Sequence, residues 1–370
     1  MGSSPLQSDL EPLTSLMSEP TSLFPASLEW EQRTQPNIWV TPPPRQRWWL
    51  YGLFLILTLF STTVVGARME FYFQNHQPVF WLSDDSLSIF PIDWIARHPA
   101  NLLLGLPFSL TLMFILFAHE MGHYLYARHY RVYATPPLFV PCPYLSLFGT
   151  LGAFIRIKSP IPSRAALFDI GIAGPIAGFI PACVALLYGL SLSRPIVGPA
   201  EPALQLGFPL AFSLAARFLN ITWPLSALSL HPIAAAAWVG MFATALNLMP
   251  GGQLDGGHIV FSISPRLHRW ISLLTVFALI PLGKYLWMGW FVWAVLLTMT
   301  GRHPRVPRYP EASGRRRALA VCAALMLVLA FTPAPITQSS GKEAWPMIRD
   351  GSRDTLHYFR DYVRHKLHRR

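Results

Sequence analysis

The stretch ANLLLGLPFSLTLMFILFAHEMGHYLYA, residues 100–127, combines a long apolar run with three ionisable side chains near its end. It is longer than the roughly 20 apolar residues that a helix needs to cross a bilayer. The three side chains, His119, Glu120 and His123, are costly at membrane depth unless they have a function. The stretch therefore predicts a membrane helix that carries a functional site.

The composition of the whole chain also indicates a membrane protein. Of the 370 residues, 52% are hydrophobic and 13% are charged, whereas a soluble domain has about 25% charged residues. The net charge of +11 comes from Lys and Arg that crowd the ends of the apolar runs, as in the cytoplasmic flanks of membrane helices. No basic face has the pattern of a nucleic-acid interface, so we expect no nucleic-acid partner. The three cysteines show no C-x-x-C spacing that would indicate a thiolate zinc site or a disulfide framework.

The apolar runs predict an all-α membrane protein, a polytopic helical bundle of six to seven transmembrane helices. The expected spans lie at 48–67, 100–127, 165–190, 232–248, 270–300 and 318–331. The run at 270–300 is too long for one straight span and is interrupted at Pro281-Leu-Gly-Lys284, so we expect a tight helical hairpin there. After the motif helix, the alternation within 148–158 predicts a short extended or β-hairpin segment.

The sequence His119-Glu-Met-Gly-His123 has the spacing of a metal site on a helix. Histidines at i and i+4 share one helix face, so both imidazoles can reach one zinc ion. Glu120 lies beside that face, where it can take a proton from a water that zinc activates. The alternative is a pair of histidines whose hydrogen bonds are satisfied by neighbouring helices.

A zinc site with two histidines needs a third protein ligand. The polar break at 247–258 offers Asp255, which glycines bracket, and also His258. We expect Asp255 to be the ligand, because an unpaired carboxylate at this depth would cost more than an unligated neutral histidine. We then expect His258 to support the metal ligands by a contact beside them, without binding the metal itself. The alternative for the whole segment is a plain loop at the membrane interface.

Two features of the run at 165–190 have open roles. Asp169 could support the site or face the substrate, or it could lie at the helix N-terminus only because the helix dipole favours a negative charge there. The small residues at 171–178 have close-packing spacing, which favours a plain helix–helix contact.

An HExxH motif in a membrane helix, followed far downstream by Asn247-x-x-Pro250 and by Leu254-Asp-Gly-Gly257, resembles the site-2 protease family of intramembrane metalloproteases, peptidase family M50. The resemblance covers roughly residues 100–260. In that family the asparagine and proline of the second motif are usually adjacent, whereas two residues intervene here. The family's best-known bacterial members carry a PDZ domain between core helices, and the segment 191–231 is too short to hold one.

The resemblance implies that His119, His123 and Asp255 bind one zinc ion and that Glu120 is the catalytic base. It also implies that Asn247 steadies the substrate or the site. On this basis the chain divides into a polar and disordered tail, a first span with its extracytoplasmic loop, the catalytic intramembrane core, additional spans, and a basic tail. The expected boundaries of these five parts are 1–46, 47–99, 100–262, 263–335 and 336–370.

Together these features predict an intramembrane zinc metalloprotease that cuts transmembrane protein substrates within or near the lipid bilayer. The alternative is a non-proteolytic metal-binding membrane protein or a metal-ion transporter, which would need more polar ligands along a path through several helices. Basic residues at 128–164 and acidic residues at 84–93 place the active site towards the cytoplasmic side. With a helical hairpin at 270–300, the arginine-rich loop at 302–317 is also cytoplasmic, and the basic C-terminal tail lies outside, against the usual charge bias. With a single span at 270–300, the tail lies inside and the arginine-rich loop lies outside.

Overall fold

The computed structural model describes residues 47–80, 87–196, 204–301, 303–304, 306–307 and 314–338. The N-terminal tail expected at 1–46 lies outside the described residues, as do Asp84, Asp85 and the C-terminal tail after Gln338.

The described part of the chain is mostly helical, and three of its helices are long and apolar enough to cross a membrane. They are α2 (Trp48–Gln74), α4 (Leu106–His129), which continues a 3-10 helix η1 (Pro99–Gly105), and α5 (Arg164–Leu192). Only 44% to 50% of the apolar part of each is buried within the protein. The remaining apolar surface faces outward, as a lipid environment requires.

Small residues let α2 pack closely against η1 and α4. A Cβ atom built on Gly105 would overlap the backbone of Thr63. The hydroxyl groups of Thr62 and Ser109 share a hydrogen bond of 2.6 Å between the two helices. Close backbone approach and hydroxyl bonds of this kind are typical of contacts between membrane helices. A short helix, α3 (Ile92–Arg97), precedes η1.

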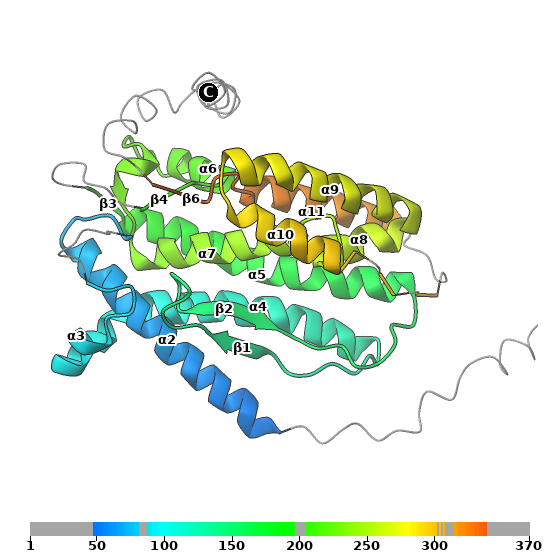
Figure 1. The fold of residues 1–370 in the computed structure, drawn as a ribbon, viewed down its shortest axis with the longest axis horizontal. Coiled ribbons are helices and arrows are strands. Elements are labelled where there is room, and N and C mark those ends of the chain that lie inside the picture. Colours follow the sequence, from blue (N-terminus) through cyan, green and yellow to red (C-terminus); the bar gives the residue numbers. More distant parts are fainter. Residues whose placement is uncertain are drawn as a thin grey trace, which may run out of the picture. The chain divides into compact units, whose positions relative to one another are not determined.

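Two short strands follow α4, the first packed mainly against α2 and the second against α4 (Figure 1). Strand β1 (Leu138–Pro141) pairs antiparallel with β2 (Thr150–Phe154), with Leu138 opposite Phe154. The turn between them is fixed to α2, because the hydroxyl of Ser61 donates to the carbonyl oxygen of Gly149 at 2.6 Å. Within the described residues β2 has β1 as its single strand neighbour, so its other edge is open.

The segment between α5 and α7 contains several short helices and strands, which begin directly after the C-terminal end of α5. These are β3 (Arg194–Pro195), β4 (Leu204–Leu206), α6 (Leu210–Phe218), η2 (Leu225–Ala227) and β5 (Leu228–Ser229). Strand β3 pairs with β5. The short apolar stretch at 208–219, whose sequence favours a surface helix or a partly inserted one, forms helix α6.

Five helices and one strand complete the described chain. They are α7 (Pro232–Leu248), α8 (Asp255–Ile263), α9 (Pro265–Tyr285), α10 (Gly289–Met299), α11 (Gly314–Ala330) and β6 (Ile336–Gln338). Helix α5 packs against α4, α7, α8 and α11, so it is the central helix of the site (Figure 1). Strand β6 pairs with β4, which fixes the segment after α11 to the chain that follows α5.

The structure corrects two local expectations. The break in the run at 270–300 falls after Tyr285, because α9 continues through Pro281. Gly283, which lies within the break that the sequence predicts, is instead a packing contact: a Cβ atom there would lie 3.0 Å from the ring of Phe291 on α10. The polar segment at 247–258 is also not irregular throughout, because α8 begins at Asp255.

Candidate metal centre

Helix α4 carries His119 and His123 one turn apart on its buried face. Their Nε2 atoms lie 3.2 Å from each other, and their ring centroids are 4.9 Å apart. Both residues are buried. The i, i+4 spacing therefore brings the two imidazoles to one point inside the protein.

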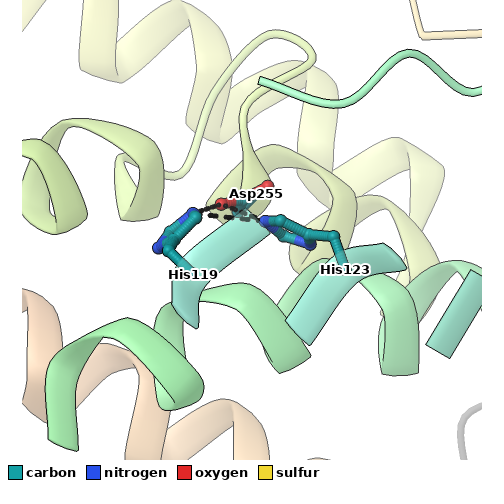
Figure 2. A group of neighbouring side chains, drawn as sticks. All are labelled: His119, His123 and Asp255. Carbon is teal, nitrogen blue, oxygen red and sulfur yellow. Dashed lines mark hydrogen bonds and ion pairs between the residues drawn. The ribbon is translucent and has the colours of Figure 1, made fainter. Parts of the chain in front are cut away.

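Asp255, in the first turn of α8, completes a cluster of three side chains (Figure 2). Its Oδ2 atom lies 3.3 Å from Nε2 of His119 and 3.2 Å from Nε2 of His123. The ligand atoms of the three residues all lie within 4.8 Å of one another. In the part of the chain that the structure describes, no second group of His, Cys, Asp or Glu residues has a comparable arrangement.

The Oδ2 atom of Asp255 is buried between two imidazoles and yet accepts no hydrogen bond. Burying a carboxylate oxygen without a partner costs free energy, so a cation bound beside this atom would stabilise it. Two imidazole nitrogens and one carboxylate oxygen form a ligand set that zinc takes in catalytic sites, where a fourth position stays open. The three residues therefore fit a zinc ion.

His123 has the orientation that a metal ligand needs. Its Nδ1 atom lies 2.7 Å from the carbonyl oxygen of Ile170 on α5. Because a carbonyl oxygen only accepts, Nδ1 carries the proton and donates, and Nε2 keeps its lone pair for the side of His119 and Asp255. A hydrogen bond of this kind commonly fixes the ring and the tautomer of a metal-ligating histidine.

Two glycines of α5 make room for the histidines. A Cβ atom built on Gly174 would overlap the ring of His123, and one built on Gly178 would lie 2.9 Å from Cβ of His119. The sequence favours a plain helix–helix contact for these small residues. In the structure α5 does pack on α4, but the side chains that fill the space above the two glycines are the two histidines of the cluster.

Glu120 and Asn247 lie at the same cluster. Glu120 is buried beside the histidines. The backbone of Ile155, the residue directly after β2, forms a hydrogen bond with the carboxylate of Glu120. Asn247, in the last turn of α7, has its Nδ2 atom 3.2 Å from Nε2 of His119. Helices α4, α7 and α8 and the end of β2 thus all contribute groups to one place.

His258 lies one turn after Asp255 on α8 but bonds to a different part of the chain. Its Nδ1 atom lies 2.8 Å from Nε2 of His303, whose Nδ1 in turn lies 2.8 Å from the carbonyl oxygen of Pro304. The ring of His303 stacks on Phe261. Because the Pro304 carbonyl only accepts, His303 carries its proton on Nδ1 and accepts from His258. His258 therefore links α8 to the segment after α10.

Asp169 lies in the second turn of α5 and faces α11 rather than the three ligand atoms. Both of its carboxylate oxygens accept from Arg316, at 2.8 Å from Nε and 2.6 Å from Nη2. The hydroxyl of Tyr130, at the end of α4, also donates to Asp169. The carboxylate is thus paired with a specific cation and is not a solitary charge at a helix N-terminus.

Sequence reasoning missed several residues that the structure brings to the cluster or its surroundings: Ile170, Gly174, His303 and Arg316. For Gly174 a signal existed in the run of small residues at 171–178. Ile170 acts through a backbone atom, which every residue has, so the sequence carries no signal for its role.

Comparison with known proteins relates part of the chain to a peptidase family and to zinc metalloproteases. A family model described as Peptidase family M50 matches residues 107–281, which contain α4, α5, α7 and α8. The chain is 27% identical over 310 residues to "Probable zinc metalloprotease EGY1, chloroplastic" of Oryza sativa subsp. japonica, covering 80% of this chain and 52% of that protein. It is 30% identical over 246 residues to "Probable zinc metalloprotease EGY2, chloroplastic" of Arabidopsis thaliana, covering 65% of this chain and 44% of that protein.

The chain thus spans about half the length of the curated relatives that it matches. Among solved structures, the site-2 protease from Methanocaldococcus jannaschii aligns over 65% of this chain at 18% identity, with a TM-score of 0.28. The family model covers both the HExxH helix and the helix that carries Asp255. Residues 107–281 therefore match peptidase family M50, the site-2 protease family that the two motifs of the chain resemble.

Proposed function

We propose that the protein is an intramembrane zinc metalloendopeptidase that hydrolyses peptide bonds of membrane proteins within or near the bilayer. The observation that carries the proposal is the buried Oδ2 atom of Asp255, which lies within 3.3 Å of two imidazole nitrogens and has no hydrogen-bond donor. A zinc ion held by His119, His123 and Asp255, one per chain, would satisfy all three groups.

Zinc in this position would lower the pKa of a water molecule and polarise the carbonyl of a peptide bond. Glu120, adjacent to the first histidine and buried with it, accepts the proton of that water. It then delivers the proton to the nitrogen of the leaving amine. The amide of Asn247, near His119 at the end of α7, is suited to hold a carbonyl group of the substrate beside the ligands.

The substrate must be extended before it can react, because a helix hides its own peptide bonds in hydrogen bonds. The open edge of β2 can capture an unwound chain by strand addition. Two contacts support this assignment: β2 lies against α4, and the backbone of Ile155 directly after it reaches Glu120. A substrate strand on this edge would run past the residue that we assign as the base.

For the membrane arrangement we propose six to seven crossings, formed by α2, α4 and α5 together with the shorter helices α7, α9, α10 and α11. The end of the bundle that holds the N-terminus of α5 then faces the cytoplasm. Exposed basic side chains gather there, from Arg128, Arg131, Arg156 and Lys158, and such residues favour the cytoplasmic side. The bond from the Arg164 amide to the Pro307 carbonyl brings Pro307, which lies between α10 and α11, to the same end.

A metal-ion transporter would need polar ligands along a path. Within the described ranges, the three residues of the cluster are the single group suited to hold a metal. This favours a peptidase.

The proposal can be tested with the purified full-length protein in lipid vesicles that also contain single-span test proteins. We expect cleavage to stop when a chelator removes the metal and to return when one equivalent of zinc is added back. A protein that cleaves equally well after metal removal, or that binds no zinc, would contradict the proposal.

A further inference from the structure

A three-residue clamp joins the ends of three helices close to the metal centre. Arg316, in the first turn of α11, holds both carboxylate oxygens of Asp169 on α5 in a two-pronged contact. The hydroxyl of Tyr130, at the C-terminal end of α4, donates to the same carboxylate, and Nη2 of Arg316 lies 3.4 Å from that hydroxyl. A guanidinium fork on a carboxylate fixes both the distance and the orientation of its partner.

The clamp adjoins the backbone group that orients His123. Asp169 directly precedes Ile170, whose carbonyl oxygen accepts from Nδ1 of His123 at 2.7 Å. On the other side, Tyr130 ends the helix that carries His123. The clamp therefore fixes the donor helix and the acceptor helix of this hydrogen bond relative to each other.

The cation of the clamp lies outside the part of the chain that the family model matches, which ends at residue 281. Its helix, α11, is also held independently at the opposite end. Strand β6 pairs with β4, and the indole of Trp290 donates to the carbonyl oxygen of Pro333 at 2.7 Å. Removal of the Arg316 side chain therefore leaves α11 anchored to the bundle, and the effect of its removal is local to the clamp.

We propose that Arg316 is a positioning residue for the metal centre: through Asp169 it holds the Ile170 carbonyl against His123 and so raises the affinity for zinc. The inference rests on the proposed function, because it takes His123 to be a zinc ligand. It makes the C-terminal helix α11 a part of the active-site scaffold. The competing interpretation is an ion pair that only attaches α11 to the bundle and has no effect on the metal.

The test compares Arg316→Gln with Arg315→Gln and Arg317→Gln in the full-length protein. Arg315 and Arg317 are exposed neighbours on the same turn and serve as matched controls. The readouts are the dissociation constant for zinc from chelator competition, the visible absorption spectrum of the cobalt-substituted protein, and the melting temperature of the metal-free protein. Arg316→Gln is expected to bind zinc about tenfold more weakly, the loss typical of an outer-shell partner, with a changed cobalt spectrum. The two controls are expected to match the wild type.

Arg316→Lys should recover part of the affinity, because an ammonium keeps the charge but cannot form the fork. Tyr130→Phe tests the clamp without a change of charge, and Tyr126→Phe, at an exposed tyrosine, is its control. If Arg316→Gln fails to fold, this pair of variants shows whether the clamp affects zinc affinity. We expect Tyr130→Phe to weaken zinc binding at an unchanged melting temperature. If wild-type protein binds zinc and both clamp variants bind it as tightly as their controls, the inference is wrong while the proposed function stands. If the wild type itself binds no zinc, the proposed function fails.

Discussion

Gly174 of α5 lies against the imidazole ring of His123 on α4, with no space for a Cβ atom between them. The ring cannot easily move away, because its Nδ1 atom is bonded to the Ile170 carbonyl on the same helix α5. The position of the imidazole is thus set by α5 on two sides, by a hydrogen bond and by close packing.

Gly174→Ala should therefore displace the His123 ring and weaken zinc binding. We expect a loss of roughly 10- to 100-fold in zinc affinity, as when an outer-shell partner is removed, together with about 1–3 kcal/mol of destabilisation from overpacking. Gly52→Ala is the matched control, because a Cβ atom on that helical glycine of α2 would meet nothing within 4 Å. Zinc titration and thermal unfolding of both variants would check this, and equal zinc affinity in the two variants would contradict the packing argument.

The next prediction concerns the third ligand. Asp255→Ala should remove nearly all bound zinc, because it deletes a carboxylate whose oxygen lies within 3.3 Å of both imidazoles. His258→Ala should lower zinc content only in part, since Nδ1 of His258 bonds to His303. Metal analysis of the purified proteins distinguishes the two. A full zinc complement in Asp255→Ala with none in His258→Ala would reverse the assignment.

The open edge of β2 gives a prediction about substrate capture. Phe154→Pro removes one backbone N–H from the last residue of the strand, so we expect it to reduce cleavage strongly while zinc content stays at the wild-type level. Phe154→Ala is the control, because it removes the exposed aromatic side chain but keeps the N–H group. Assays with one membrane substrate should show a larger loss for proline than for alanine. Equal rates in the two variants would exclude strand addition at this position.

The proposed topology can be checked by labelling single cysteines in a protein that lacks Cys142, Cys183 and Cys322. Lys158→Cys lies at the basic end of the bundle, and Thr222→Cys lies near the C-terminal end of α5, where it borders the same pocket as Leu190. In intact cells a membrane-impermeant maleimide should label the cysteine at 222 and reach the cysteine at 158 only after permeabilisation. The reverse pattern would place the active site on the other side of the membrane.

The sequence was sufficient for the parts of the site that depend on local spacing. His119, Glu120 and His123 lie within five residues of one helix, so their arrangement follows from helix geometry alone. Asp255 could be singled out because an unpaired carboxylate at membrane depth is costly. That it starts helix α8 rather than lying in a loop could not be predicted, because the glycines around it favour a turn as much as a helix start.

Other features depend on contacts between distant segments. The pairing of Asp169 with Arg316 joins α5 to α11. In the sequence Arg316 is one of three consecutive arginines, and their positive charge indicates only which side of the membrane they lie on. The end of α9 differs from the sequence expectation for a related reason. Pro281 and Gly283 are typical of a helix break, but Gly283 is needed to pack α9 against Phe291 of α10, and tertiary packing outweighs the local preference.

The central claim is that Glu120 moves protons for peptide hydrolysis beside a zinc ion that it does not bind. The most direct measurement is a comparison of membrane-protein termini between cells that carry the wild-type protein and cells that carry Glu120→Gln, with zinc content determined on the purified variant. We predict new peptide ends in or near transmembrane segments only with the wild type, since loss of a general base slows the reaction by about 10²- to 10⁴-fold, and a normal zinc content in Glu120→Gln. Identical sets of termini in the two cell lines, with the protein present and loaded with zinc in both, would contradict the account.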